Sequence, residues 1–426
     1  MNYLLPVKIV QSENIENGCS VLKKKALQIG LGEKDCLIVK GKGFIGFDFG
    51  KETCGGIRIL TSWAESGSAK IRLRFGESLA EAYSDIGYKN STNDHSPRDF
   101  ECDICSLSDL TFGQTGFRFV RIDFIEAKQV KIKAVAAEEK ILNIKPRYTF
   151  KGEDETIGQI FNAAKRTIDL CAGGEYLWDG IKRDRLVWIG DIYPEMLALT
   201  TLYGRTEIIE KSLDFIKDAT VLPAFMNDMP TYSMWWIIVL HDYYQITGCK
   251  DFLDKQIGYL EKLIKILNLN VGENGELNYD IFVDWPTRGD KNETTGTRCI
   301  NLAAAEKARA ILKAYGKDTK YACEMIVKLK KGSFAIESKK QVIGLKYYAF
   351  GEISDEEYDL LVKGGAVGLS TFMSYFILTA IAAKDKKLAV RIMKDYYGKM
   401  LDLGATTFWE DFDIAWTQNA SGIDEL

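Results

Sequence analysis

The chain has 426 residues, a hydrophobic share of 46%, a charged share of 27% and a formal net charge of -4. This length exceeds one ordinary domain and predicts two or three, and the small negative charge lacks the basic footprint of a nucleic-acid-binding protein. The sequence has no run of about eighteen apolar residues, so we expect no membrane span.

The cysteines and the N-terminus indicate the compartment. Nine scattered cysteines, an odd number, favour reduced thiols, and residues 1–10 lack the pattern of a signal peptide. Cys102 and Cys105 form a C-x-x-C pair without the further ligands that a zinc site requires. We therefore expect a cytoplasmic protein without a metal or another cofactor.

Residues 1–147 are expected to form a domain of β-strands. Residues 44–50, 69–76 and 117–124 alternate apolar with polar side chains, which is the period of a half-buried strand. Short strands separated by turns predict a sandwich of two antiparallel sheets. The stretch 83–99, rich in serine, asparagine, aspartate and proline, is expected to be a long loop within this domain.

Residues 148–426 are expected to form an all-α domain. Its first helix covers residues 156–171, where apolar residues recur at spacings of three and four, and Asp154 is the candidate N-cap. A short hairpin is expected around residues 277–282. Consecutive helices without a fixed repeat favour a bundle or a helical toroid over a solenoid. The other amphipathic segments lie at 192–203, 207–219, 230–247, 251–268, 298–315, 318–330, 369–384 and 386–400.

The most unusual stretch is 178–191, which combines three carboxylates, three basic residues and two tryptophans. A buried element does not satisfy so many charges, and a solvated loop has little use for two tryptophans, so the stretch is typical of a polar, aromatic-walled pocket. Pro194 predicts a helix start near Asp191, which places Asp179 and Asp184 on the preceding loop. Asp191 is also a natural N-cap, a role compatible with a place in the pocket.

Two interpretations of this stretch stay open. Arg183 and Arg185 flank Asp184 and suit either a structural ion-pair network or a binding site. Trp178 and Trp188 suit either the core or stacking on the C–H face of a sugar whose hydroxyls bind carboxylates. Four acid–aromatic stretches in one helical domain favour a shared site. The other three are 226–236, 282–290 and 404–413.

Residues 179–191 resemble the signature of the bacterial α-L-rhamnosidases, glycoside hydrolase family 78, in the six-hairpin glycosidase superfamily. The shared pattern is an aspartate, an arginine–acid–arginine triplet, a tryptophan and a final glycine–aspartate. Residues 404–410, Gly-Ala-Thr-Thr-Phe-Trp-Glu, resemble the later motif of the family. The pair Asp284 and Trp285 has a counterpart too, as do β-rich residues 75–77 and 116–119, so the resemblance covers most of the chain.

The resemblance implies an inverting exo-glycosidase with an N-terminal β-sandwich followed by an (α/α)6 toroid. It would remove terminal α-L-rhamnose, or a related sugar, from glycosides or polysaccharide fragments. By the resemblance Asp184 would be the general acid and Glu410 the general base. Glycosidases use two such carboxylates, and inverting ones keep them about 6.5 to 9.5 Å apart. The residues implied for sugar binding are Asp179, Arg183, Trp188, Asp191, Trp236, Asp284 and Trp285.

Two departures from the family pattern leave alternatives. Asp184 stands where the family usually has glutamate, which shortens the reach of the acid. The chain ends at Leu426, soon after Glu410, which leaves open an incomplete toroid at the C-terminus. One alternative is another (α/α)6 glycosidase, such as a glucosidase or an unsaturated uronide hydrolase, and a second is a non-catalytic sugar-binding relative.

The partner expected for either function is a carbohydrate, with no nucleic acid and no membrane, and a homodimer is one assembly left open. The chain contains two histidines, His95 and His241. They leave little room for a Ser-His-Asp triad or a multi-histidine metal site.

Overall fold

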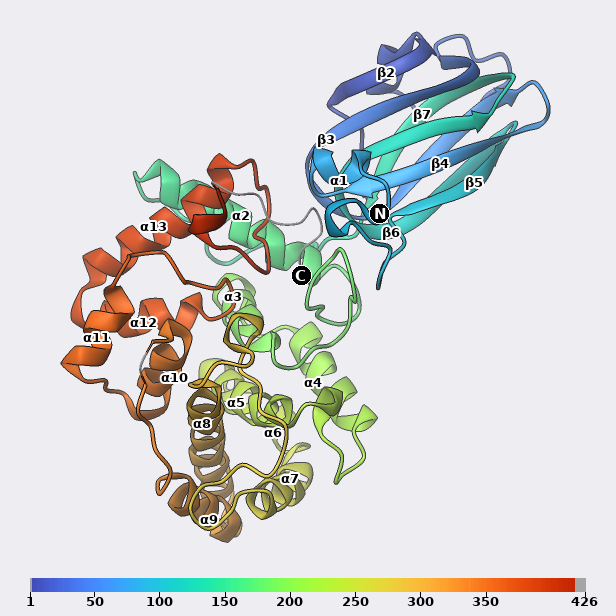
Figure 1. The fold of residues 1–426 in the computed structure, drawn as a ribbon. Coiled ribbons are helices and arrows are strands. Elements are labelled where there is room, and N and C mark those ends of the chain that lie inside the picture. The colour runs from blue at the N-terminus through green and yellow to red at the C-terminus, as the bar shows by residue number, and fades with distance from the viewer. Residues whose placement is uncertain (1, 337, 418–426) are drawn as a thin grey trace.

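The computed structural model describes residues 2–336 and 338–417, with a sheet domain followed by a helical domain (Figure 1). The strands form one seven-stranded antiparallel sheet in the order β1-β7-β3-β6-β4-β5, with β2 paired to β3. The strands are β1 (Asn2–Leu4), β2 (Lys8–Glu16), β3 (Leu37–Ala64), β4 (Ser68–Gly76), β5 (Asp99–Cys105), β6 (Ser108–Glu126) and β7 (Gln129–Glu139).

The long strands β3 and β6 are shared between two parts of this sheet. The first part of β3 pairs with β2 and with the end of β6, and its second part pairs with the start of β6. Strand β7 pairs with both parts, at Leu37–Lys40 and at Ile57–Ala64. The register shifts between Asp48 and Thr53 and again between Gly55 and Ile57, and such irregularities bend a strand. Phe47 from the first part and Ile57 from the second lie in the same apolar core. The predicted antiparallel sandwich is therefore confirmed, with strands that run through both of its layers.

The helical domain has an inner and an outer set of helices (Figure 1). Few residues of the inner helices are exposed, because other elements cover these helices on most sides. They are α3 (Ile192–Tyr203), α5 (Pro230–Thr247), α8 (Glu293–Ala314), α10 (Lys340–Phe350) and α12 (Ser374–Lys384). The outer helices bury one apolar stripe each. They are α2 (Glu155–Cys171), α4 (Glu207–Ala219), α7 (Ile257–Leu269), α9 (Lys320–Leu329), α11 (Asp355–Val362) and α13 (Lys386–Asp402).

Outer and inner helices alternate along the chain, which is the arrangement of the predicted helical toroid. Successive inner helices pack against one another from α3 to α12. The ring of Tyr193 on α3 stacks on Phe376 of α12 with centroids 5.6 Å apart and also contacts Tyr348 of α10, so the inner helices meet around a common centre. On the outside, α13 packs against α2. Within residues 2–336 and 338–417, no helix has both the length and the apolar character needed to cross a membrane.

Most predicted helices occur with nearly the expected bounds, and residues 192–203, 207–219 and 230–247 are helical throughout. Asp154 caps α2, since its carboxylate accepts the Ile157 N–H at 3.1 Å. The segment predicted as one helix over 251–268 is instead the short α6 (Lys250–Leu253) followed by α7. The predicted hairpin is reduced to a single bridge between Val271 and Leu277, and α10 and α11 were not predicted.

Polar contacts join the two domains where β3 bends. The guanidinium of Arg166 on α2 donates to the Glu52 carbonyl at 2.9 Å and to the Glu139 carboxylate at 2.6 Å. The backbone N–H of Glu52 donates to the Thr406 hydroxyl at 2.7 Å. These bonds hold the stretch 404–410, which carries one of the two candidate catalytic acids, against the sheet domain.

Candidate active site

A closed loop between α2 and α3 carries the first group of candidate acids. At its base, the Asp179 N–H donates to the Leu186 carbonyl at 3.2 Å and the Asp179 carboxylate accepts the Leu186 N–H at 2.8 Å. At its tip, Asp184 and Arg185 have left-handed backbones with φ of 50° and 54°, and the Arg185 N–H donates to the Arg183 carbonyl at 2.6 Å. A three-residue turn of this hand is rare and strained. The turn fixes the direction in which Asp184 leaves the backbone.

The Asp184 carboxylate is held from two sides. The indole N–H of Trp188 donates to one oxygen at 3.1 Å, and Nδ1 of His95 contacts the other. His95 comes from the loop between α1 (Leu79–Tyr83) and β5, in the sheet domain. The Asp184 side chain remains 22% exposed, so a ligand can reach it.

Asp191 and Glu195 lie one helical turn apart at the start of α3. Asp191 occupies the N-cap position, but its side chain makes no capping hydrogen bond, contrary to the expected role. One carboxylate oxygen of Glu195 is buried without a hydrogen-bond partner among the described residues. Burial, together with the negative charge of neighbouring acids, raises the pKa of both carboxyls well above the ordinary range. This shift favours the protonated form of both carboxyls, which can donate a hydrogen bond.

Asp179, Asp184 and Glu410 share one electrostatic environment. Burial, together with the charges of Asp184 and Glu410, raises the pKa of Asp179 to about 7. Burial also raises the pKa of Glu410, with a contribution from Asp184 and an opposing one from Arg183. Strand β6 holds both stretches, because the Thr115 hydroxyl donates to the Lys182 carbonyl at 2.7 Å and the Arg118 guanidinium donates to the Gly404 carbonyl at 3.0 Å. Glu410 itself is an exposed residue, although its acidic surroundings are largely buried.

A row of aromatic rings connects three of the four acid–aromatic stretches. Trp188 contacts Tyr232 with ring centroids 5.9 Å apart, Tyr232 contacts Phe282 at 6.2 Å, and Phe282 contacts Trp285 at 5.3 Å. Trp285 is 56% exposed and ends the row at the surface. Trp188 and Trp285 thus belong to one wall, and Trp188 also bonds the acid Asp184.

Two side chains expected to bind sugar are buried and already hydrogen-bonded to other residues of the protein. Trp236 is fully buried in α5, where its indole N–H donates to the Leu213 carbonyl at 3.2 Å. The expectation that it walls the pocket is therefore corrected: Trp236 lies in the core. Asp284 is 6% exposed, and its two oxygens accept the hydroxyls of Thr287 and Ser370, the latter at 2.9 Å. This bonding connects the stretch 282–290 to the segment before α12.

Four residues border the site without having been selected from the sequence, namely His95, Glu195, Asn227 and Tyr232. The Asn227 side chain accepts the Ile189 N–H at 3.2 Å and so holds the end of the acid loop. Burial and the charges of nearby acids, Asp191 foremost, raise the pKa of Tyr232. Asn227 and Tyr232 both lie in the acid–aromatic stretch 226–236, which the composition singles out only as a whole.

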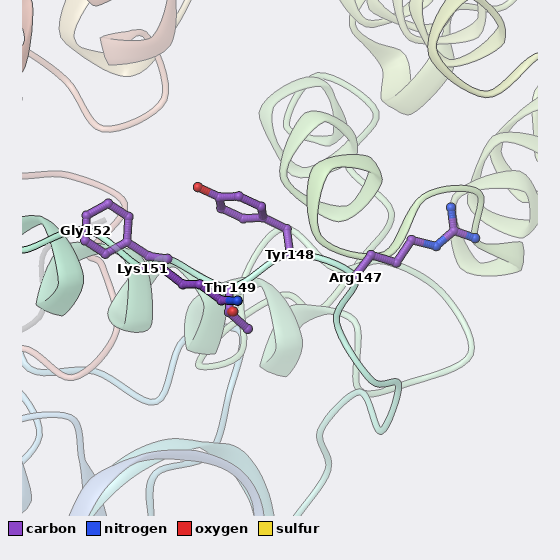
Figure 2. A pocket seen from close by; sticks show the side chains of 6 residues that line it. Arg147, Tyr148, Thr149, Lys151 and Gly152 are labelled. Carbon is purple, nitrogen blue, oxygen red and sulfur yellow. The ribbon is translucent and has the colours of Figure 1, made fainter.

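A surface hollow of about 400 Å³ lies elsewhere, along the link that precedes α2 (Figure 2). The six consecutive residues 147–152 line it, and none of them is acidic. Because a glycosidic bond is cleaved between two carboxyl groups, this hollow lacks the chemistry that the acid cluster supplies. The acid cluster is therefore the candidate active site.

The family model described as the bacterial alpha-L-rhamnosidase 6 hairpin glycosidase domain matches residues 146–323. Among solved structures, a rhamnosidase from Klebsiella oxytoca with rhamnose bound is 17% identical, with a TM-score of 0.77 over 100% of this chain and 92% of the other. A family 78 rhamnosidase from a Bacillus species is 18% identical, with a TM-score of 0.75 over 96% of this chain and 46% of the other.

A Streptomyces avermitilis alpha-L-rhamnosidase complexed with L-rhamnose is 15% identical, with a TM-score of 0.61 over 100% of this chain and 41% of the other. At such identities the similarity shows the fold alone. The chain spans most of the Klebsiella protein but less than half of the Bacillus and Streptomyces proteins. No curated protein matches the chain.

Proposed function

We propose that the chain is an inverting exo-glycosidase that removes terminal α-L-rhamnose from glycosides or polysaccharide fragments, because residues 146–323 match the model of the bacterial alpha-L-rhamnosidase 6 hairpin glycosidase domain. The observation that carries this proposal is that strand β6 holds both the loop of Asp184 and the stretch of Glu410, which are far apart in the sequence. The choice of sugar is supported by the Klebsiella and Streptomyces proteins, whose structures hold rhamnose.

In the proposed reaction Asp184 protonates the glycosidic oxygen while the bond from that oxygen to the anomeric carbon breaks. Glu410 accepts a proton from the water molecule that attacks the opposite face of the sugar. This division needs two carboxyls with space for a water between them. The solvent contact of Glu410 supports its role as the base, because the attacking water must reach it.

The other acids are suited to hold the sugar hydroxyls. Protonated Asp191 and Glu195 donate hydrogen bonds to hydroxyl oxygens without adding negative charge to an already acidic site. Asp179, with a pKa of about 7, accepts or donates according to pH. In the proposal Arg183 offsets the charge of Glu410, and Trp188 and Trp285 cover an apolar face of the sugar.

The test is hydrolysis of an aryl α-L-rhamnoside beside a panel of aryl glucosides, fucosides and an unsaturated uronide. Asp184→Asn and Glu410→Gln are each expected to lower kcat about 10²- to 10⁴-fold. Glu175→Gln, which changes an exposed acid in the link before the site, is the matched control and should leave kcat unchanged. Thermal melting of all variants checks that the fold is retained.

The products decide between this proposal and its alternatives. Proton NMR should detect the β-anomer of rhamnose first, as inversion requires. Cleavage of a glucoside or a uronide, but of no rhamnoside, would favour another toroid glycosidase. Rhamnose binding without any cleavage would favour a non-catalytic relative, in keeping with the aspartate at the acid position.

A further inference from the structure

The loop between α1 and β5 brings a histidine of the sheet domain to the acid site of the helical domain. Nδ1 of His95 contacts Oδ1 of Asp184, while Oδ2 of the same carboxylate accepts the Trp188 indole N–H at 3.1 Å. The proposed general acid is thus held by one residue from each domain. The His95 side chain is 57% exposed, so its ring can exchange protons with water.

Hydrogen bonds beside His95 and Asp184 fix the distance between the two loops that carry them. Ser96, which follows His95, is buried, and its hydroxyl donates to the Thr115 hydroxyl oxygen at 3.2 Å. The Thr115 hydroxyl donates in turn to the Lys182 carbonyl at 2.7 Å, two residues before Asp184. Two consecutive hydrogen bonds therefore tie the loop that carries the histidine to the loop that carries the acid.

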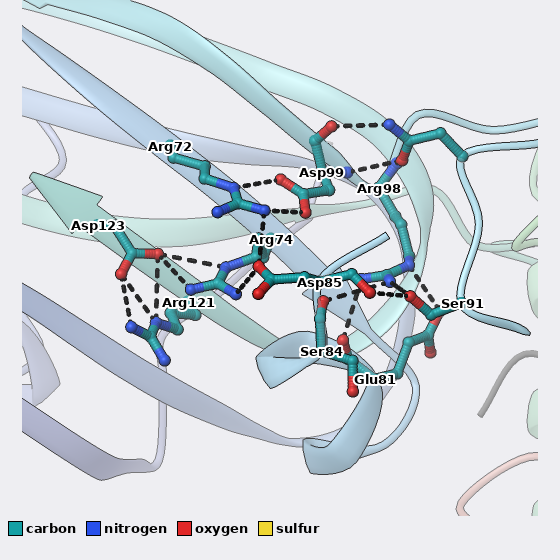
Figure 3. Close-up of polar contacts among 11 residues, drawn as sticks. Arg72, Arg74, Glu81, Ser84, Asp85, Ser91, Arg98, Asp99, Arg121 and Asp123 are labelled. Carbon is teal, nitrogen blue, oxygen red and sulfur yellow. Dashed lines mark hydrogen bonds and ion pairs between the residues drawn. The ribbon is translucent and has the colours of Figure 1, made fainter. Parts of the chain in front are cut away.

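The same loop is anchored to its own domain through Arg98 (Figure 3). Arg98 is 3% exposed, and its guanidinium donates to the Glu81 carbonyl at 3.0 Å and to the Ser91 hydroxyl at 2.6 Å. The Asn93 side chain accepts the backbone N–H groups of Arg98 and Asp99, each at 3.0 Å. None of these bonds involves His95, so the loop presents the imidazole in a conformation fixed beforehand.

We propose that His95 is a positioning residue that orients Asp184 and supplies the proton that Asp184 donates in each turnover; this rests on the proposed function. The His95 imidazolium passes its proton to the Asp184 carboxylate, which gives it to the leaving oxygen as the glycosidic bond breaks. The oxygen of water bonds to the anomeric carbon, and a proton of that water goes to Glu410. The neutral imidazole then takes a proton from solvent, while Glu410 releases one. One water is consumed and no net proton.

The pairing answers a difficulty that an aspartic acid has as a proton donor. An isolated aspartic acid ionises near pH 4, well below the neutral range, whereas an imidazolium in contact with it keeps a proton to higher pH. The hydrogen bond to Asp184 and the charges of Asp184 and Asp94 raise the pKa of His95, and Arg183 opposes this rise. Above that pKa the pair has lost its proton, so acid catalysis is expected to fall as pH rises through it.

The variant His95→Asn tests this role with little disturbance of the loop. The histidine has a left-handed backbone with φ of 60°, a conformation that asparagine adopts more easily than most residues. Asparagine retains hydrogen-bonding capacity but carries no exchangeable proton in this pH range. Asn90→Gly is the matched control, since Asn90 is an exposed residue of the same loop with φ of 65°.

Aryl α-L-rhamnosides with leaving groups from dinitrophenol to phenol distinguish a loss of acid catalysis in His95→Asn from a general disturbance of the site. We expect His95→Asn to lower kcat/KM about 10- to 100-fold for the phenyl glycoside, which needs protonation, and less than about twofold for the dinitrophenyl glycoside. The alkaline limb of the pH profile should also move to lower pH. An equal loss with every leaving group and an unmoved alkaline limb would overturn the proposal, because a purely structural role predicts that result.

Proton NMR tests the pair without any activity. The chain has two histidines, so His95→Asn identifies which imidazole signal belongs to His95. The signal should titrate above pH 6.5 in the wild type, and its midpoint should fall in Asp184→Asn. An unchanged midpoint would refute the pairing even in an active hydrolase. Absence of hydrolysis of every glycoside, with the midpoint moving as expected, would instead refute the proposed function.

Discussion

Asp179→Asn should stabilise the protein at alkaline pH and leave its stability unchanged in acid. The carboxyl has a pKa of about 7 in place of 3.8, and at about 1.4 kcal/mol for each tenfold change in proton affinity this difference corresponds to about 4 kcal/mol. Because the side chain is only half-buried, solvent screening reduces the expected effect to about 2 kcal/mol. The asparagine carbonyl oxygen can still accept the Leu186 N–H, so the loop keeps its closing bond.

The sign of this effect follows from proton binding. Between about pH 4 and pH 7 the native state holds a proton on Asp179 that the unfolded state has lost, so wild-type stability falls as pH rises through this window. The asparagine variant lacks this fall. Its melting temperature should match the wild type near pH 4 and exceed it by a few degrees near pH 8.

Scanning calorimetry at both pH values measures the difference. The control is Asp103→Asn, which removes an exposed carboxyl from β5. Its effect on the melting temperature should be the same at both pH values. An Asp179→Asn offset that is the same in acid and in alkali would refute the reasoning, since it would mean that the carboxyl ionises in the folded protein as freely as in the unfolded chain.

Three further substitutions separate the binding wall from the core. Trp285→Ala should raise KM for an aryl rhamnoside about 3- to 10-fold in steady-state kinetics with little change in melting temperature, and an unchanged KM would remove Trp285 from the wall. Trp236→Phe should do the reverse, lowering stability by about 1 to 3 kcal/mol in denaturant unfolding because the Leu213 carbonyl loses its donor. Gly190→Ala should lower both stability and kcat, since its Cβ would overlap the Tyr232 ring; wild-type values for both would contradict the close packing at this position.

The helical domain could be predicted wherever an apolar stripe was long enough to show its period. Helix α10 was not predicted because Gly344 interrupts the apolar stripe of its sequence. The structure needs that glycine, since a Cβ there would lie 2.9 Å from the Ile377 backbone nitrogen on α12. Helix α11 is short, but Ser354 and Glu357 form a capping box that the sequence does display. Helix α10 could not be predicted because its glycine serves the packing between helices. Helix α11 could have been predicted from its capping box.

The continuity of the sheet was harder to predict. Glycines 50, 55 and 56 resemble turns between short strands, because glycine is the usual residue where a chain reverses. In the structure they lie inside the single strand β3 at its bend. A bend and a reversal use the same residue type, and only the pairing with β6 and β7 tells them apart.

Some residues of the candidate site could be predicted from local sequence, whereas others depend on tertiary structure. The loop 178–191 could be selected from local composition, and Glu195 could have been added because it follows Asp191 by four residues on the same helix face. His95 offered no local signal, since its contact with Asp184 depends on how two domains dock. The prediction for Trp236 was wrong because a tryptophan near the start of a helix suits a pocket wall and the protein core equally well. Only tertiary packing decides between the two, and it places Trp236 in the core.

The substitution of aspartate for glutamate at position 184 is best understood with the docking of the domains. A shorter side chain keeps the carboxyl closer to its own backbone, so the strained left-handed tip at Asp184 and Arg185 has a larger share in setting where the carboxyl lies. A carboxyl on such a tip would rotate freely without support, and Trp188 and His95 hold one oxygen each. The sheet domain therefore contributes to the acid itself, which makes the interface between the domains part of the catalytic apparatus that we propose.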